Sequence, residues 1–196
     1  MMKLRIDYKL TAFLIIALLL IGCQRSYALD EKTESASLKS YSRLELTSPT
    51  DTKELDYLGL TANRSVFLVS EIKADVIIVE LVTAYCSYCE GKISRLNEVY
   101  QLVQKSPYSE KIKIIGVGMS NTERELNLFK EKYNIPFPLF ADPENRIYTV
   151  SGRVDMPHWV VLKSDQNGEM KEIYSASREL PEPKAFLDMI LEKSNI

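Results

Sequence analysis

The clearest pattern in the chain is a run of seven residues, 76–82, in which only Glu80 is polar. Most of the others are β-branched, which indicates a strand that is buried on both faces. A helical pattern follows within a few residues, because apolar side chains recur about every third or fourth position at Ile93, Leu96, Val99, Tyr100 and Val103. The pattern predicts a buried strand followed by an amphipathic helix, which ends at Ser106-Pro107.

Shorter patterns on both sides predict an alternating series of elements. A capping box near Thr122 indicates the start of a second long helix, and Asn167-Gly168 is typical of a hairpin turn. Gly91 falls inside the first helix, where we expect it to be tolerated. We expect a hairpin of strands 56–60 and 65–69, a helical turn at 70–73, strands at 111–118, 137–140, 156–162 and 169–174, and helices at 120–134, 144–150 and 183–193.

The N-terminal region has the features of a processed signal. Residues 1–9 carry three basic side chains, and residues 10–21 form a 12-residue apolar core, which is short for a membrane-spanning helix of about 20 residues. The core ends in Leu-Ile-Gly-Cys at Cys23, which resembles a bacterial lipobox. We therefore expect a lipoprotein signal peptide at 1–22, lipidation of Cys23, a flexible tether at 23–54 and one folded domain at 55–196. The alternative is an ordinary secretory signal in which the cysteine has no role.

Lipidation would place the mature protein outside the cytoplasm, on the periplasmic face of a bacterial membrane, with the membrane as a partner through the acyl chains on Cys23.

The amino-acid composition does not narrow the function: 45% apolar and 27% charged residues are ordinary for a globular domain. The net charge of −2 gives no support for nucleic acid as a partner.

Cys86 and Cys89 lie at the joint between the buried strand and the first helix. A cysteine at a helix N-terminus has a lowered thiol pKa, and a second cysteine three residues later is close enough to form a disulfide. C-x-x-C beside a strand–helix pattern is typical of thiol–disulfide exchange. A zinc site would need two further ligands, and the chain has only one other cysteine and one histidine, His158. An inert structural disulfide is the other alternative; for exchange we expect neither a metal nor another cofactor.

In its order of elements and its C-x-x-C helix, the chain resembles the thioredoxin fold, and within it the membrane-tethered TlpA-like branch, over roughly residues 55–193. The resemblance also rests on the strand–helix unit 111–133, the segment 137–142 and the pair Met156-Pro157. It implies an α/β thioredoxin-like fold in which helices flank a central mixed sheet, with an N-terminal hairpin and that strand–helix unit as an insertion. It also implies that Pro157 is cis and lies against the cysteines, and that Met156 offers its backbone to an extended substrate.

The resemblance implies an extracytoplasmic thiol–disulfide oxidoreductase that acts on disulfides of secreted or periplasmic proteins and is re-reduced by a membrane or periplasmic thiol reductant. The chain departs from the family at Tyr85, Ser87 and Ser94, where tryptophan, proline and proline are common. Tyr85, Ser87 and Tyr88 are expected to contact substrate. Ser87 and Tyr88 carry no charge that would stabilise a Cys86 thiolate further, so we expect action in the reducing direction.

Each ionisable residue of this region has an expected role. Cys86, at the helix terminus, is the expected nucleophile, and Cys89 is the resolving thiol. Glu80 is expected to be buried with a raised pKa and to accept the proton of Cys89. The resemblance supports this role, because thioredoxins have a buried acidic residue at the matching position, although TlpA-like members often have a neutral residue there. The alternative is a locally exposed strand in which Glu80 faces water. We expect His158 to be a packed strand residue.

Two other function classes remain open. Thr83-Ala84-Tyr85-Cys86 matches the T-x-x-C motif of peroxiredoxins, although Val79 stands where that motif has proline, and strand 158–162 has no clear counterpart of the peroxide-polarising arginine. A redox-inactive binding module on the same fold is the third possibility, but such a module would more often have lost one of the two cysteines.

Overall fold

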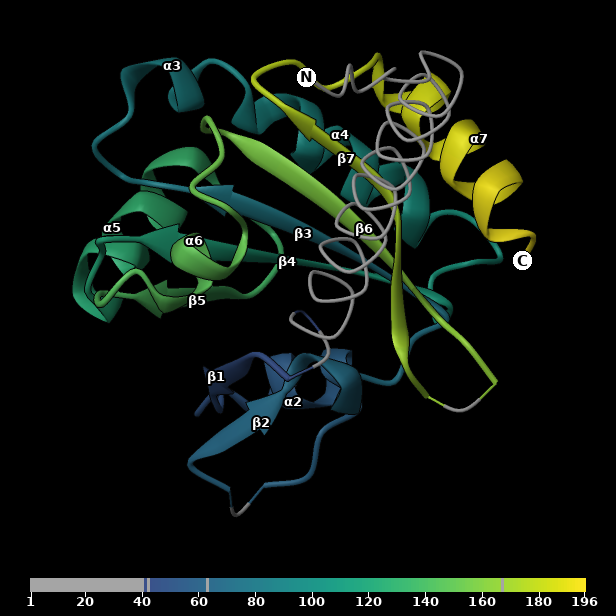
Figure 1. Cartoon of the computed structure of the whole chain (residues 1–196), viewed down its shortest axis with the longest axis horizontal. Helices are drawn as coiled ribbons and strands as arrows, with labels where there is room; N and C mark the ends of the chain where they lie inside the picture. Colours follow the sequence, from purple (N-terminus) through teal and green to yellow (C-terminus); the bar gives the residue numbers. More distant parts are fainter. Residues whose placement is uncertain (1–40, 42, 63, 167) are drawn as a thin grey trace, which may run out of the picture. The chain divides into compact units, whose positions relative to one another are not determined.

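The computed structural model describes residues 41, 43–62, 64–166 and 168–196. The expected signal peptide, Cys23 and the first part of the expected tether lie outside these residues. The described elements are drawn in Figure 1. In chain order they are β1 (Glu45–Thr47), α2 (Thr52–Leu58), β2 (Val66–Leu68), the 3-10 helix η1 (Val69–Glu71), β3 (Val76–Val82), α3 (Ser87–Glu90), α4 (Ile93–Gln104), β4 (Ile112–Met119), α5 (Glu123–Tyr133), β5 (Leu139–Asp142), α6 (Arg146–Val150), β6 (His158–Ser164), β7 (Met170–Ser177) and α7 (Pro183–Ser194).

A five-stranded mixed sheet forms the centre of the domain, in the order β5-β4-β3-β6-β7. Strand β3 pairs with β4 in parallel, and β4 pairs with β5 in parallel. Strand β6 pairs antiparallel with both β3 and β7. The prediction of a parallel start and an antiparallel finish, and with it the thioredoxin-like α/β class, is confirmed.

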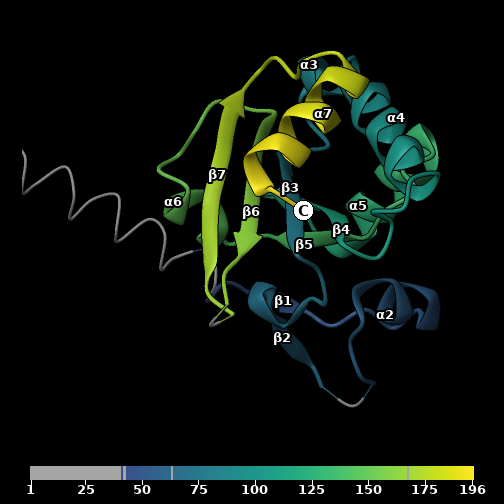
Figure 2. The same ribbon diagram turned by 90° about the vertical axis from the view of Figure 1, so that its right-hand side faces the viewer.

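The sheet separates two hydrophobic cores. On one face, α4 and α7 lie side by side (Figure 2) and pack with the strands around Ile78, Val82 and Trp159. On the other face, the small sheet of β1 and β2, helix α2 and helix α6 pack against residues such as Ile77 and Leu81. All seven residues of β3 are buried, as the run of apolar residues predicts.

The N-terminal part of the domain corrects two predictions. Residues 52–58 form helix α2 and not the first strand of a hairpin, because Asp51 caps the helix by accepting the N–H of Lys53 (2.8 Å), and Gly59 ends it at φ 66°. Strand β2 pairs instead with β1 in an antiparallel ladder. The expected tether therefore ends too late, since β1 lies inside 23–54 and Tyr41 is already buried.

The helix after the cysteines is divided in two. Helix α3 covers only four residues and has Gly91 as its C-cap, and α4 starts at Ile93 after Lys92. Gly91 is thus at a helix end and not inside a continuous helix. The second long helix, α5, starts as predicted, with a capping box between Thr122 and Glu125.

Helix α2 also protects an open part of the sheet. Strand β5 pairs with β4 only from Gly116 onward, so among the described residues no strand pairs with the backbone of Ile114 on the side of β4 away from β3. The Tyr57 hydroxyl accepts the Ile114 N–H (2.8 Å) and donates to the Ile114 carbonyl (3.4 Å). One side chain thereby replaces the missing strand at this position.

Candidate active site

The two cysteines form a disulfide at the point where the chain leaves β3. Cys86 is the N-cap of α3 and lies 5.2 Å from Cys89, Cα to Cα. The Cys89 N–H points at the Cys86 sulfur, 3.1 Å away. Cys86 is partly exposed, whereas Cys89 is buried at 1% exposure. The Cys86 sulfur can therefore contact another molecule, whereas the Cys89 sulfur is covered by the protein and cannot.

The break after α3 changes the electrostatic argument. The sequence predicts a lowered thiol pKa for a cysteine at the start of one continuous helix, but α3 has only four residues. The macrodipole of a helix is the sum of its aligned peptide dipoles, so a helix of four residues contributes little of it. The stabilising contact that the structure offers is therefore local: the N–H of Cys89 donates to the Cys86 sulfur.

Glu80 lies in β3 on the same sheet face as Ile78 and Val82, which pack in one core with Cys89. Its side chain is buried at 1% exposure, and neither carboxylate oxygen has a hydrogen-bond partner among the described residues. Burial raises the pKa of Glu80 to about 8, and the neighbouring Trp159 indole offsets this only in part. The prediction that Glu80 is buried with a raised pKa is confirmed; the exposed alternative is wrong.

The peptide bond between Met156 and Pro157 is cis, as the resemblance implies. Strand β6 begins directly after it at His158, which is paired with Leu81 near the end of β3. Pro157 is buried and lies at the same edge of the sheet as the cysteine turn, while Met156 is partly exposed. The Pro157 carbonyl accepts the N–H of Arg178, 2.7 Å away.

His158 is a packed strand residue, as expected. It is buried at 4% exposure, and its ring nitrogens lie 2.8 Å and 3.1 Å from the hydroxyls of Ser177 and Ser175. Burial lowers its pKa, so the ring is neutral at pH 7.

Tyr85 and Tyr88 are exposed, at 67% and 45%. The Tyr85 hydroxyl donates to the carboxylate of Glu125 in the first turn of α5. That hydrogen bond, with the N–H of Thr122, lowers the pKa of Glu125 to about 2. The turn before Cys86 is also tied to the α5 side, since the Ala84 N–H donates to the buried side chain of Asn121 (2.9 Å).

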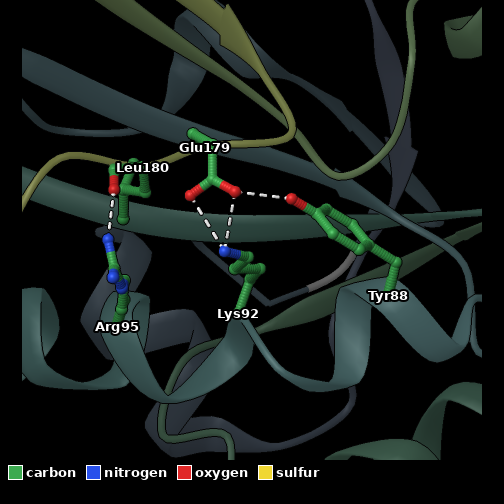
Figure 3. A network of polar contacts seen from close by, with 5 residues as sticks. All are labelled: Tyr88, Lys92, Arg95, Glu179 and Leu180. Atoms are coloured by element: carbon green, nitrogen blue, oxygen red, sulfur yellow. Dashed lines mark hydrogen bonds and ion pairs between the residues drawn. The ribbon is translucent and has the colours of Figure 1, made fainter.

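The opposite side of the cysteine turn is held by the segment after β7 (Figure 3). Glu179 accepts hydrogen bonds from the Tyr88 hydroxyl (2.6 Å) and from Lys92, whose ammonium lies 2.8 Å from each carboxylate oxygen. Arg95 of α4 donates to the Leu180 carbonyl (2.7 Å). Residues 178–180 therefore contact α3, the start of α4 and, through the N–H of Arg178, the cis-proline loop.

The structure thus places the two cysteines, Tyr85, Tyr88 and the cis-proline pair at the edge of the sheet where β3 ends, with Ser87 exposed between the cysteines. Glu80 is buried inside β3, two residues before the end of the strand. Sequence reasoning missed Asn121, Glu125 and Glu179. The capping-box pattern predicts Glu125 as a helix cap but not as the acceptor of the Tyr85 hydroxyl. For Glu179 the sequence carries no signal, because its partners lie 87 and 91 positions away.

The described part of the chain has no cluster of three or more residues suited to a metal ion. Among the same residues, none of the helices combines the length and apolar character needed to cross a membrane.

The model of the AhpC/TSA family matches residues 54–187. The thiol-disulfide oxidoreductase ResA of Geobacillus thermodenitrificans is 24% identical over 106 residues, which is 54% of this chain and 58% of that protein. A secreted Mycobacterium tuberculosis disulfide oxidoreductase homologous to E. coli DsbE has a similar structure (TM-score 0.52, 12% identity, 82% of this chain and 98% of that one). The pneumococcal exposed lipoprotein thioredoxin Etrx1 of Streptococcus pneumoniae also has a similar structure (TM-score 0.50, 12% identity, covering 76% of this chain and 98% of that one). At these identities the structural likenesses establish the fold.

Proposed function

This chain belongs to the AhpC/TSA family, and we propose that it catalyses thiol–disulfide exchange on polypeptide substrates through Cys86 and Cys89. The observation that carries the proposal is the asymmetry of the bonded pair: one sulfur is partly exposed at a helix start and the other is buried. Exchange requires such a pair, because one thiol must reach the substrate and a second must release it.

In the reducing direction, the Cys86 thiolate attacks one sulfur of a substrate disulfide. The S–S bond of the substrate breaks, and its other sulfur leaves as a thiolate with the electron pair. Cys89, after losing its proton, attacks the Cys86 sulfur of the mixed disulfide. This step forms the Cys86–Cys89 disulfide and releases the second substrate thiolate, so two electrons pass to the substrate. An upstream thiol reductant must then return the pair to the dithiol.

Glu80 is the proposed acceptor of the Cys89 proton. Its carboxylate lies on the Cys89 side of the sheet, beside the Trp159 indole, and has no hydrogen-bond partner among the described residues. Because burial raises its pKa to about 8, only about a tenth of Glu80 is ionised at pH 7. The resolving step should therefore accelerate as the pH rises toward 8.

The substrate is proposed to lie along Tyr85, Ser87, Tyr88, Met156 and Pro157. The first three surround Cys86 in the sequence and are exposed. The cis-proline pair supplies the backbone of Met156 at the same edge of the sheet, and an extended peptide could pair with it as an added strand.

A peroxidase is the second candidate, and the T-x-x-C match at Thr83 is the observation that favours it. Against it, the Thr83 hydroxyl accepts the N–H of Tyr85 (3.5 Å) within its own turn. The arginines that border the site are also engaged, Arg95 with the Leu180 carbonyl and Arg178 with Asp155 (3.3 Å). Turnover of insulin disulfides and of hydrogen peroxide by the same preparation separates these functions, and activity on neither would leave a redox-inactive binding module.

A trapping experiment tests the roles of the two cysteines. Cys89→Ser should accumulate a mixed disulfide with substrate through Cys86, because the first attack proceeds and the second cannot. The trapped species is measured by non-reducing electrophoresis and mass spectrometry of the linked peptide. Trapping by Cys86→Ser would reverse the assignment.

For localisation, we propose a lipid anchor on Cys23 after removal of residues 1–22. The lipobox-like sequence supports it. The anchor would hold the domain at the periplasmic face of the membrane, within reach of secreted proteins and of a membrane or periplasmic thiol reductant.

A further inference from the structure

Two exposed aromatic side chains stand close to the proposed nucleophile. Only five large apolar or aromatic side chains are exposed in the described part of the chain, and two of them are Tyr85 and Tyr88, one and two positions from Cys86. We refer to them as the tyrosine pair. Exposed aromatic rings at a reactive centre point to contact with a partner, because they keep a large apolar area in water.

Both rings are held in place by carboxylates from distant parts of the chain. The Tyr85 hydroxyl donates to Glu125, which also accepts the N–H and the hydroxyl of Thr122 (2.7 and 2.8 Å). Tyr88 donates to Glu179, which Lys92 holds in turn. Glu125 lies on the helix that leads to β5 and Glu179 follows β7, so the anchors come from opposite sides of β3 in the sheet order.

These contacts determine which surface of the tyrosine pair is free to bind a partner. The hydroxyls already donate to carboxylates of the protein, and the Lys92 ammonium lies 5.3 Å from the centroid of the Tyr88 ring. The Tyr85 ring and the remaining exposed surface of the Tyr88 ring are therefore the free contact area. The charges beside Tyr88 are compensated, since Lys92 pairs with Glu179 and Arg178 pairs with Asp155. The Glu125 carboxylate beside Tyr85 has no ion pair among the described residues and is held by hydrogen bonds from Tyr85 and Thr122. Rings that are already fixed also lose little conformational freedom on binding. An apolar partner group fits these properties better than a charged one.

We propose that the tyrosine pair binds an apolar side chain next to the reactive cysteine of the substrate polypeptide, with Glu125 and Glu179 as positioning residues that hold the two rings. The inference rests on the proposed function, because it concerns the substrate of the same site. It adds a sequence preference that the cysteines alone do not impose.

Peptides Gly-X-Cys-Gly that carry an aryl mixed disulfide on the cysteine test this preference, with X as Leu, Ser or Arg. The Cys86 thiolate of the reduced full-length chain attacks the peptide sulfur, the bond to the aryl sulfur breaks, and the coloured aryl thiolate leaves with the electron pair. Stopped-flow absorbance gives the second-order rate constant, and each value is divided by that of glutathione with the same peptide. We expect the Leu peptide to react about five- to tenfold faster than the Ser and Arg peptides.

Substitutions test whether the tyrosine pair causes the preference for the Leu peptide. Tyr85→Ala and Tyr88→Ala should each reduce it, and so should Glu179→Ala, which leaves the Tyr88 ring unanchored. Glu179→Gln should retain it, because the amide oxygen still accepts from the Tyr88 hydroxyl. Asp188→Ala is the matched control, since this exposed carboxylate also holds a lysine (Lys184, 2.6 Å) but lies outside the site.

The outcomes separate the inference from the proposed function. Equal rates for the Leu and Ser peptides with the wild type would refute the inference while leaving exchange intact. Faster reaction of the Arg peptide would refute it as well, since a cation over the rings would then be the occupant. No release of aryl thiolate from any peptide would overturn the proposed function itself. Thermal unfolding of each variant confirms that the rates refer to folded protein.

Discussion

Glu80→Gln should make the protein more stable at pH 8 and slow the resolving step of exchange. Glutamine keeps the shape of the side chain but cannot ionise. Wild-type Glu80 is buried at 1% exposure beside Trp159, with no hydrogen-bond partner for its carboxylate among the described residues. Its charged form is therefore costly in the folded state, and removal of the charge removes that cost.

The size and sign of the effect follow from proton linkage. The pKa of Glu80 is about 8 in the folded protein, against 4.5 when exposed. Between these values the folded state binds one more proton than the unfolded state, so stability falls as the pH rises, by about 1.4 kcal/mol per pH unit. The full cost is absent below pH 4.5 and reaches about 5 kcal/mol above pH 8 at most, which is comparable to the total stability of many domains.

Urea unfolding of the oxidised protein at pH 5, 6, 7 and 8, followed by circular dichroism, measures this difference. The two proteins should have similar stability at pH 5, and the variant should gain progressively toward pH 8. Parallel pH curves for wild type and Glu80→Gln would show that Glu80 does not carry a raised pKa. Stopped-flow kinetics then tests the proton transfer: the first attack by Cys86 should be unchanged and resolution by Cys89 slower. An unaltered resolution rate across pH 6–8 would leave Glu80 as a structural residue only.

Four further changes test the anchor and the fold. Cys23→Ala should block lipidation and release the protein from membranes without changing the redox chemistry of the purified chain; equal membrane partitioning of mutant and wild type would contradict the lipoprotein proposal. Tyr57→Phe should cost about 1–3 kcal/mol in urea unfolding, because it leaves a β4 N–H without its partner. Gly118→Ala should cost about as much, because a Cβ there would overlap the Leu126 side chain. At Gly91 a Cβ would make only an ordinary contact, 3.8 Å from the Tyr88 carbonyl oxygen, so Gly91→Ala should leave stability nearly unchanged.

The sequence predicted those parts of the fold and site that short stretches determine. The apolar run of β3 is unmistakable because both faces of that strand are covered. The cysteine pair and Glu80 lie within ten positions of one another, so their placement follows from the strand and the turn after it. The start of α5 was visible because Thr122 and Glu125 form the cap among themselves.

The errors lie where local patterns are ambiguous or where partners are remote. Residues 56–60 contain alternating apolar positions that suit a strand, but Leu55 and Leu58 are also one helical turn apart, and Asp51 supplies the cap that decides for a helix. Strand β1 has one buried residue, Leu46, which is too little for a periodic signal. Glu179 is an ordinary exposed acid in the sequence and acquires its role only when β7 brings it to Tyr88.

The direction of the strands explains why three distant segments meet at the cysteines. Strand β3 ends at one edge of the sheet, and the turn with Cys86 follows at that edge. Strand β6 is antiparallel to β3, so it begins at that edge, and the cis-proline loop that precedes it must lie there. Strand β7 is antiparallel to β6, so it ends at the same edge and delivers residues 178–180. The same pairing places Trp159 opposite Glu80, and because side chains alternate along a strand, a shift of one residue in β6 would turn the indole to the other face of the sheet. The register of a single antiparallel pair therefore sets both the position of the cis-proline loop and the surroundings of the buried carboxylate.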